Sequence, residues 1–225
     1  MSSIQGQTDL KIYGFSGKVK IVKYFVYNEI SILEDSSWDR ENSILFSEKK
    51  LCFDKSGNLD SMVESFHRGR FFEKYITYYN HSSNRLKSSK KYRYYTNELI
   101  EEMNYTWTDG HQKCKFKGVG IKSFTKGERV LYYNHREKKG SYRIESMKGV
   151  LQLKESYKNE FDGYWNLIKT KYSNANTGDY TILYQYENYD EKGNACTIKL
   201  IDQKSKKLNK FIFKEFEYYD SLTKE

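Results

Sequence analysis

Proline is absent from the 225-residue chain, so every tight turn must be built from glycine, asparagine, aspartate or serine. Cysteine is scarce as well: Cys52, Cys114 and Cys196 lie far apart and form no C-x-x-C pair. The odd count argues against a disulfide framework, and no Cys/His spacing suits zinc. We therefore expect free thiols, with no metal and no other cofactor.

Long apolar runs are missing too. No apolar stretch reaches the length of about 18 residues that a membrane-spanning helix needs, so no such span is expected. The opening MSSIQGQTDL has neither the basic start nor the apolar centre of a signal peptide. This start slightly favours a cytoplasmic location, and the periplasm or envelope is the alternative if a leader has been removed.

Signatures of catalysis are equally hard to find. The chain has no P-loop, dinucleotide fingerprint or G-x-S-x-G motif. Its histidines, His67, His81, His111 and His135, fall in or beside expected turns, without the i, i+4 spacing of a helical metal site. His111 and Cys114 come nearest to a Cys/His pair, and a turn role fits them better. We therefore predict no catalytic residue and no enzyme.

Aromatic residues are abundant, with 22 tyrosines and 13 phenylalanines. They lie in runs of about 6–10 residues separated by Gly, Asn or Asp, which predicts an all-β fold. We expect an extended antiparallel meander of consecutive β-hairpins, open or curled into a half-barrel. Residues 1–16 would be a lead, 17–220 one repeat domain with a candidate break near 117–128, and 221–225 a tail. Segments 42–51 and 97–105 also have passable helical spacing.

One hexapeptide recurs along the chain. FDKSGN (53–58) and YDEKGN (189–194) share the pattern aromatic–Asp–x–x–Gly–Asn, and YNHSSN (79–84) and FDGYWN (161–166) keep parts of it. The Asp or Asn would accept hydrogen bonds from the following amides, and the Gly would take a left-handed conformation. Reuse at several places favours turn geometry over catalysis. The predicted structural turn residues are Asp54, Gly57, Asn58, Asn80, Asn84, Asp162, Asp190, Gly193 and Asn194.

Together with its flanking strands, this hexapeptide resembles the YD-repeat (RHS-like) β-hairpin proteins, and most closely small uncharacterised members from Bacteroidetes. The resemblance is carried in order by GKVKIVKYFVYNEIS (17–31), EKKLCFDKSGNLDSMVESF (48–66) and YQYENYDEKGNACTIKLI (184–201) with KFIFKEFEYY (210–219). It covers about residues 17–219, with a departure from the pattern at 97–150. It implies stacked antiparallel hairpins. It implies no shared activity.

Basic residues interleave with aromatic ones in KKYRYY (90–95), RGRFFEKYITYY (68–79) and KFIFKEFEYY (210–219). Such a mixture is typical of protein interfaces, of single-stranded nucleic-acid platforms and of ordinary amphipathic strands. Lys and Arg number 39 against 30 Asp and Glu, a net charge of +9 that would attract acidic partners. The candidate binding face comprises Arg70, Tyr75, Tyr78, Tyr92, Arg93, Tyr94, Lys210 and Phe213.

These observations favour a non-enzymatic β-repeat protein that binds another protein. The sharpest hypothesis is an immunity or antitoxin-like protein that neutralises a bacterial effector toxin by covering its acidic surface or cleft. One alternative is a cell-envelope (lipo)protein of YD-repeat type with a structural or glycan-binding role. A second alternative is a single-stranded nucleic-acid binder.

Overall fold

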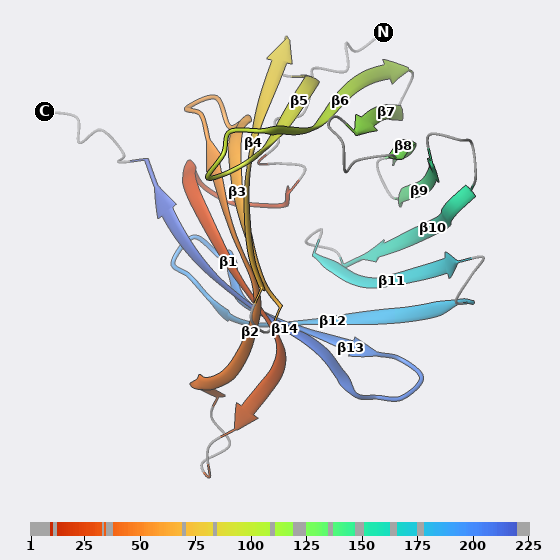
Figure 1. The fold of residues 1–225 in the computed structure, drawn as a ribbon. Coiled ribbons are helices and arrows are strands. Elements are labelled where there is room, and N and C mark those ends of the chain that lie inside the picture. The colour runs from red at the N-terminus through yellow and green to blue at the C-terminus, as the bar shows by residue number, and fades with distance from the viewer. Residues whose placement is uncertain are drawn as a thin grey trace, which may run out of the picture.

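The described residues form fourteen antiparallel β-strands in the computed structural model (Figure 1). The structure describes residues 10, 13–32, 34, 38–68, 71–82, 85–108, 111–118, 125–134, 137–146, 151–162, 166–174 and 178–219, and from 107 to 155 it describes the backbone alone. The strands are β1 (Val19–Ile32), β2 (Trp38–Phe53), β3 (Leu59–Arg68), β4 (Phe71–Ser82), β5 (Arg85–Arg93), β6 (Leu99–Thr108), β7 (His111–Gly118), β8 (Thr125–Asn134), β9 (Glu137–Ser146), β10 (Leu151–Phe161), β11 (Leu167–Asn174), β12 (Tyr180–Tyr189), β13 (Ala195–Asp202) and β14 (Leu208–Tyr218).

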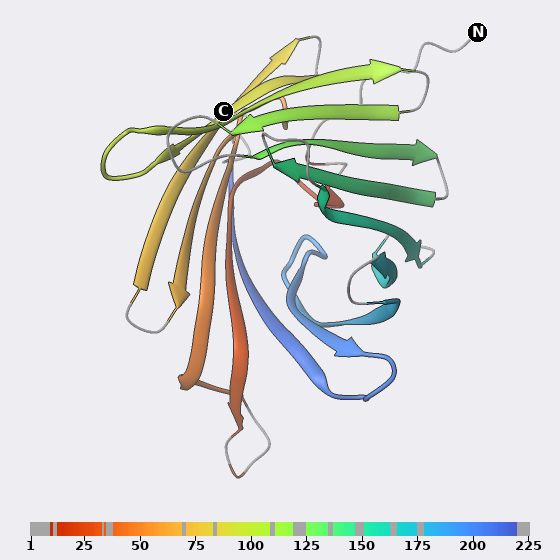
Figure 2. The ribbon, with the colours of Figure 1, turned by 45° about the vertical axis from the view of Figure 1, so that its right-hand side comes forward.

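Neighbours in the sequence are neighbours in the sheet, and the order ends where it begins. Each strand pairs with the next, and β1 pairs with both β2 and β14, which closes a barrel. Val22 of β1 lies opposite Leu51 of β2 and Phe216 of β14. Figure 2 shows the blue β14 running beside the red β1. The predicted all-β meander is confirmed, and its curl continues until the last strand reaches the first.

Both segments with helical spacing are strands. Residues 42–51 belong to β2 and residues 97–105 lead into and form part of β6, because pairing with neighbouring strands overrides the weak helical preference of short apolar runs. The candidate break at 117–128 spans the connection between β7 and β8. Those two strands pair from His111↔Tyr132 to Lys117↔Lys126, so the sheet continues across it.

The two complete hexapeptides form the same turn. Gly57 and Gly193 have φ of 85° and 80°, in the left-handed region where a side chain is strained. The Asp54 carboxylate accepts hydrogen bonds from the amides of Ser56 and Asn58, at 2.8 and 2.9 Å. Asp190 accepts the same two bonds from residues 192 and 194, at 2.9 and 2.8 Å. This is the geometry that the sequence predicts.

The two incomplete copies differ from each other. Asp162 accepts a hydrogen bond from the Asn166 amide at 2.8 Å, so this copy keeps the turn's carboxylate cap. The prediction for Asn80 is wrong, since Asn80 lies inside β4 opposite Ser88 and β4 continues to Ser82. Ladder pairing with β5 extends the strand through the expected turn. Asn84 lies outside the described residues.

Side chains alternate between the two faces of the sheet. We call the face that carries Val22, Leu51 and Phe216 the inner face, because Leu10 and Phe15 of the N-terminal segment pack against it. The opposite face is the outer face. Val22 and Leu51 are buried there together with Leu10, so the apolar core lies where the N-terminal segment meets strands β1, β2 and β14.

The N-terminal segment is held by both complete hexapeptide turns. The Leu10 amide donates to the Gly57 carbonyl at 3.0 Å. The Ser16 amide donates to Asn194 Oδ1 at 2.7 Å, and Asn194 Nδ2 donates back to the Ser16 carbonyl at 3.0 Å. The two turns therefore lie at the same end of the barrel and bind the chain just before β1 begins.

Candidate binding faces

Exposed aromatic side chains gather on the outer face of strands β4 and β5. Tyr78 is 51% exposed and its ring meets that of Tyr92 at 6.1 Å between centroids. Lys74 places Nζ 4.0 Å from the centroid of the Tyr94 ring, and the Tyr94 amide donates to the Lys74 carbonyl. We call this surface the outer tyrosine patch. It comprises Phe72, Lys74, Tyr78, Tyr92, Tyr94 and Tyr95.

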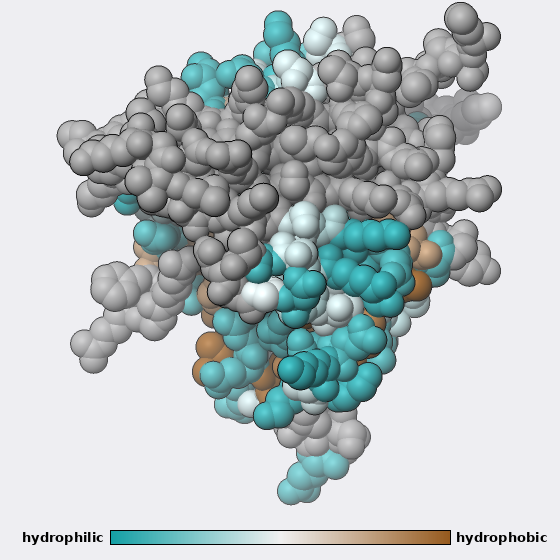
Figure 3. Space-filling view, turned by 90° about the vertical axis from the view of Figure 1, so that its right-hand side faces the viewer, coloured by the Kyte–Doolittle hydropathy of each residue, from teal (hydrophilic) through white to brown (hydrophobic). Residues whose placement is uncertain are grey.

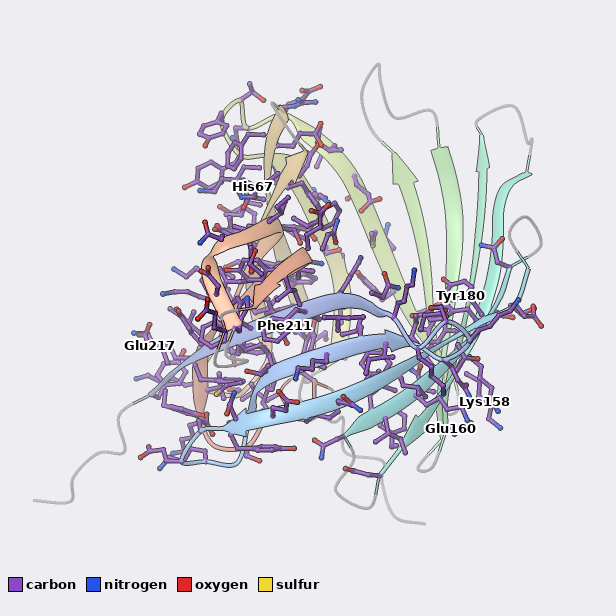
Figure 4. All side chains as sticks on the ribbon, turned by 90° about the horizontal axis from the view of Figure 1, so that it is seen from below. His67, Lys158, Glu160, Tyr180, Phe211 and Glu217 are labelled. Carbon is purple, nitrogen blue, oxygen red and sulfur yellow. The ribbon has the colours of Figure 1, made fainter. Side chains whose placement is uncertain are left out.

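The patch continues to the connection between β3 and β4. Phe72 is 50% exposed and meets the His67 ring at 5.2 Å. Tyr95, 69% exposed, contacts Tyr94 edge-on at 5.3 Å. Figure 4 shows His67 on the opposite side of the barrel from Tyr180.

Figure 3 shows another face of the molecule, and in its described part hydrophilic residues predominate and apolar residues form smaller spots.

The predicted binding residues are divided between the two faces. Tyr78, Tyr92 and Tyr94 come together in the outer tyrosine patch. Tyr75 and Arg93 lie opposite each other on the inner face, because neighbours along a strand point to opposite faces. The prediction of one face for all of them is therefore wrong.

The other three predicted residues lie away from this patch or outside the description. Lys210 and Phe213 are on β14, where Lys210 Nζ lies 5.3 Å from the Phe46 ring centroid. Phe213 packs against Phe25 and Trp38 at 6.1 and 5.7 Å, in an aromatic cluster with structural contacts of its own. Arg70 lies outside the described residues.

The inner face holds an ion-pair network around a buried carboxylate. Glu64, whose side chain is 8% exposed, contacts Lys49 and Lys91 at 2.9 Å each. Burial alone would raise the pKa of Glu64, but the two lysines outweigh it and hold the pKa below its ordinary value. Burial raises the pKa of the neighbouring Glu101, with Lys91 opposing it. These groups link β2, β3, β5 and β6 along the inner face of the barrel.

The sequence alone does not predict that Phe72 and Tyr95 belong to the outer tyrosine patch. It also does not predict the ion-pair network of the inner face. Phe72 and Tyr95 stand in the aromatic–basic runs, but nothing local separates them from their neighbours. The strand register supplies the missing signal, because it places Phe72 opposite His67 and brings Tyr94, just after β5, beside Lys74. Register depends on pairing between strands and is invisible in one segment.

Among the residues that the structure describes, no group of three or more His, Cys, Asp or Glu is placed to hold a metal ion. Cys52 and Cys196 carry free thiols. The side chains of His111, Cys114 and His135 lie outside the description. In the described part of the chain, no helix is both long and apolar enough to span a membrane.

No family model and no curated protein matches the chain, so its resemblance to YD-repeat proteins stays a prediction. Among solved structures, a porin-like protein from Bacteroides uniformis aligns with 7% identity and a TM-score of 0.49, over 90% of this chain and 98% of that one. A porin-like protein from Bacteroides vulgatus aligns with 11% identity and a TM-score of 0.46, over 86% and 98%. A LolA superfamily protein from Nitrosomonas europaea gives 9% identity and a TM-score of 0.28, over 92% and 88%.

Proposed function

We propose that this chain is a non-enzymatic protein-binding protein and that the outer tyrosine patch contacts the partner. The exposure of Phe72 and Tyr78 on β4, and of Tyr94 and Tyr95 in the turn after β5, carries the proposal. Tyrosines on a sheet offer large contact area with few rotatable bonds, which is why they are enriched at the centres of protein interfaces.

The charge around the patch selects the kind of partner. Lys74 and Lys90 lie on the same face as Tyr78, and the whole chain carries a net charge of +9. Lys90 contacts Glu102 at 3.6 Å with both side chains about half exposed, so that pair is weak and Lys90 can exchange Glu102 for another carboxylate. A protein with an acidic surface fits this patch best.

Calorimetry with the purified products of neighbouring genes tests the proposal. The double variant Tyr78→Ser, Tyr94→Ser should weaken binding by about 10-fold or more. Tyr189→Ser is the matched control, because Tyr189 is 54% exposed at the end of β12. The proposal fails if no product binds, or if the double variant binds as the wild type does.

The specific form of the proposal is neutralisation of a bacterial effector. Co-expression of the chain with a toxic neighbouring gene product should restore growth, and the double variant should not. Failure of every neighbouring product to be neutralised removes the immunity role but leaves protein binding to the calorimetric test.

Single-stranded nucleic acid is a second candidate for the same patch. The ammonium of Lys74 stacked on the Tyr94 ring combines a cation with an aromatic face, as platforms for single strands do. Fluorescence anisotropy with a labelled oligonucleotide at two salt concentrations tests it. Binding that fails to weaken steeply with salt would exclude this role.

A further inference from the structure

Lys214 is a lysine buried on the inner face. It lies on β14 opposite Tyr24 of β1, two residues before Phe216, and only 6% of the lysine's surface is exposed. Lysines are rarely buried to this degree unless a partner compensates the charge. The groups around its ammonium therefore decide what this position does.

Three aromatic rings surround the ammonium. Its Nζ lies 5.6 Å from the ring centroid of Phe15, 5.8 Å from that of Tyr24 and 5.5 Å from that of Phe216. Phe15 belongs to the N-terminal segment and also packs edge-on against Phe216 at 5.5 Å. The rings attract the cation through their negative faces, but they offer it no negative charge.

Within the described residues, no hydrogen bond or ion pair reaches this ammonium. The acidic groups that influence it are Cys196 on β13 and Asp190 in the turn before that strand. The Asp190 carboxylate is already occupied by the Tyr218 hydroxyl and by the amides of residues 192 and 194. Desolvation by burial lowers the pKa of Lys214 to about 8, with Cys196 and Asp190 opposing it.

The contrast with Lys49 and Lys91 is direct. Those lysines also belong to the inner face, and each contacts Glu64 at 2.9 Å. The ammonium of Lys214 faces aromatic rings, whereas the ammonium groups of Lys49 and Lys91 contact a carboxylate. The barrel therefore contains one buried ammonium whose counter-charge is absent from the described side chains.

Aliphatic side chains also lie near Lys214 on the inner face. Val22 lies two residues before Tyr24 on β1 and is fully buried, and Ile198 lies two residues after Cys196 on β13 and is 9% exposed. Ile212, two residues before Lys214 on β14, lies opposite Ile198. A molecule that met this ammonium would meet aromatic and aliphatic side chains on both sides of it. Fourteen strands also give a barrel wider than one that side chains alone fill.

We propose that Lys214 is the anion-binding residue of an interior site for an apolar-chain carboxylate. The ammonium would pair with the carboxylate, and the Phe15 and Phe216 rings with the aliphatic side chains would take the chain. One ammonium matches one monoanionic head, which favours a carboxylate over a doubly charged phosphate. This site is separate from the outer tyrosine patch and goes beyond the protein-binding role.

Calorimetry with laurate and with 1-dodecanol tests the site, because the two molecules share an apolar chain and differ in head charge. Laurate should bind the wild type about 10-fold or more tightly than dodecanol does, since a desolvated charged pair is worth at least that factor. Lys214→Met should abolish that preference. Lys210→Met is the matched control on the same strand and should keep it.

Three outcomes would overturn the proposal: no binding of laurate, equal binding of laurate and dodecanol, or unchanged laurate binding by Lys214→Met. Tighter binding of dodecyl phosphate than of laurate would overturn the carboxylate assignment. Laurate labelled with carbon-13 at the carboxyl gives a readout in the wild type, independent of whether the variant folds. Pairing should lower the pKa of the bound carboxyl below that of free laurate, and a raised pKa contradicts the ion pair.

Discussion

Asn194 and Ser16 lie 178 positions apart in the sequence and are joined by two hydrogen bonds. The Asn194 amide oxygen accepts from the Ser16 amide at 2.7 Å, and its nitrogen donates to the Ser16 carbonyl at 3.0 Å. Asn194 is 4% exposed and its nitrogen also reaches the Tyr218 hydroxyl. The last residue of the hexapeptide thus joins the N-terminal segment to the final hairpin.

We predict that Asn194→Ala lowers the free energy of unfolding by about 2 kcal/mol more than Asn166→Ala does. Both asparagines occupy the same position in their turns and both bond the leading aspartate, but among the described residues only Asn194 also bonds to the N-terminal segment. Urea unfolding of both variants measures the difference. Equal losses would show that the clamp contributes nothing.

Glu64→Gln should lower the free energy of unfolding by about 2 kcal/mol at pH 7, because Lys49 and Lys91, whose side chains are 38% and 25% exposed, would lose the buried carboxylate that both contact. Glu102→Gln, in an exposed pair with Lys90, should lower it by less than about 1 kcal/mol. The comparison separates buried from exposed ion pairs in one barrel wall.

The stability of the wild type should also depend on pH more strongly than that of Glu64→Gln. The folded-state pKa of Glu64 lies below its ordinary value, so its stabilisation is complete above the unfolded pKa and is lost as pH falls through the folded one. Wild type should therefore lose more stability than Glu64→Gln between pH 7 and pH 3. Parallel pH curves would contradict the assignment.

Lys214→Met should raise the free energy of unfolding by about 2 kcal/mol at pH 7, because it replaces a buried charge by an apolar side chain of similar length. The folded pKa of about 8 lies below the ordinary value of 10.5, so protonation disfavours the folded state. This penalty is complete below pH 8 and is relieved as pH rises from 8 towards 10.5. The advantage of the variant should shrink between pH 7 and pH 9.5, and a constant gap would contradict this.

Substitutions in the outer tyrosine patch should separate stability from binding. Tyr78→Ser with Tyr94→Ser should change the free energy of unfolding by less than about 1 kcal/mol, since both residues are about half exposed. Tyr27→Ser should lower it by about 3 kcal/mol, because Tyr27 is 4% exposed and packs on Trp38. Thermal and urea unfolding give both values. A large loss in the double variant would assign the patch a structural role.

Local chemistry explains which parts of the fold could be predicted. The turns at Asp54 and Asp190 need only residues within six positions, so the hexapeptide reveals them. Asn80 looks the same in sequence, but pairing between β4 and β5 decides its conformation. The pairing of β1 with β14 joins residues almost 200 positions apart and leaves no local pattern.

The candidate sites were harder to predict for the same reason. Tyr92 and Arg93 are neighbours in the sequence, yet only Tyr92 reaches the outer tyrosine patch. Lys214 stands in a run of Lys, Glu and Phe that would suit any exposed strand. One of the rings around its ammonium, Phe15, comes from the N-terminal segment, which no pattern within β14 reveals.

The seam between β1 and β14 also sets an order of events during synthesis. Each of the other strands can pair with a neighbour made just before it, so the meander can grow hairpin by hairpin from local contacts. The free edge of β1 has to wait until residues 208–218 leave the ribosome. Throughout that interval β1 presents unpaired amides and carbonyls, which makes the nascent chain most vulnerable to strand exchange with another copy just before the barrel is complete.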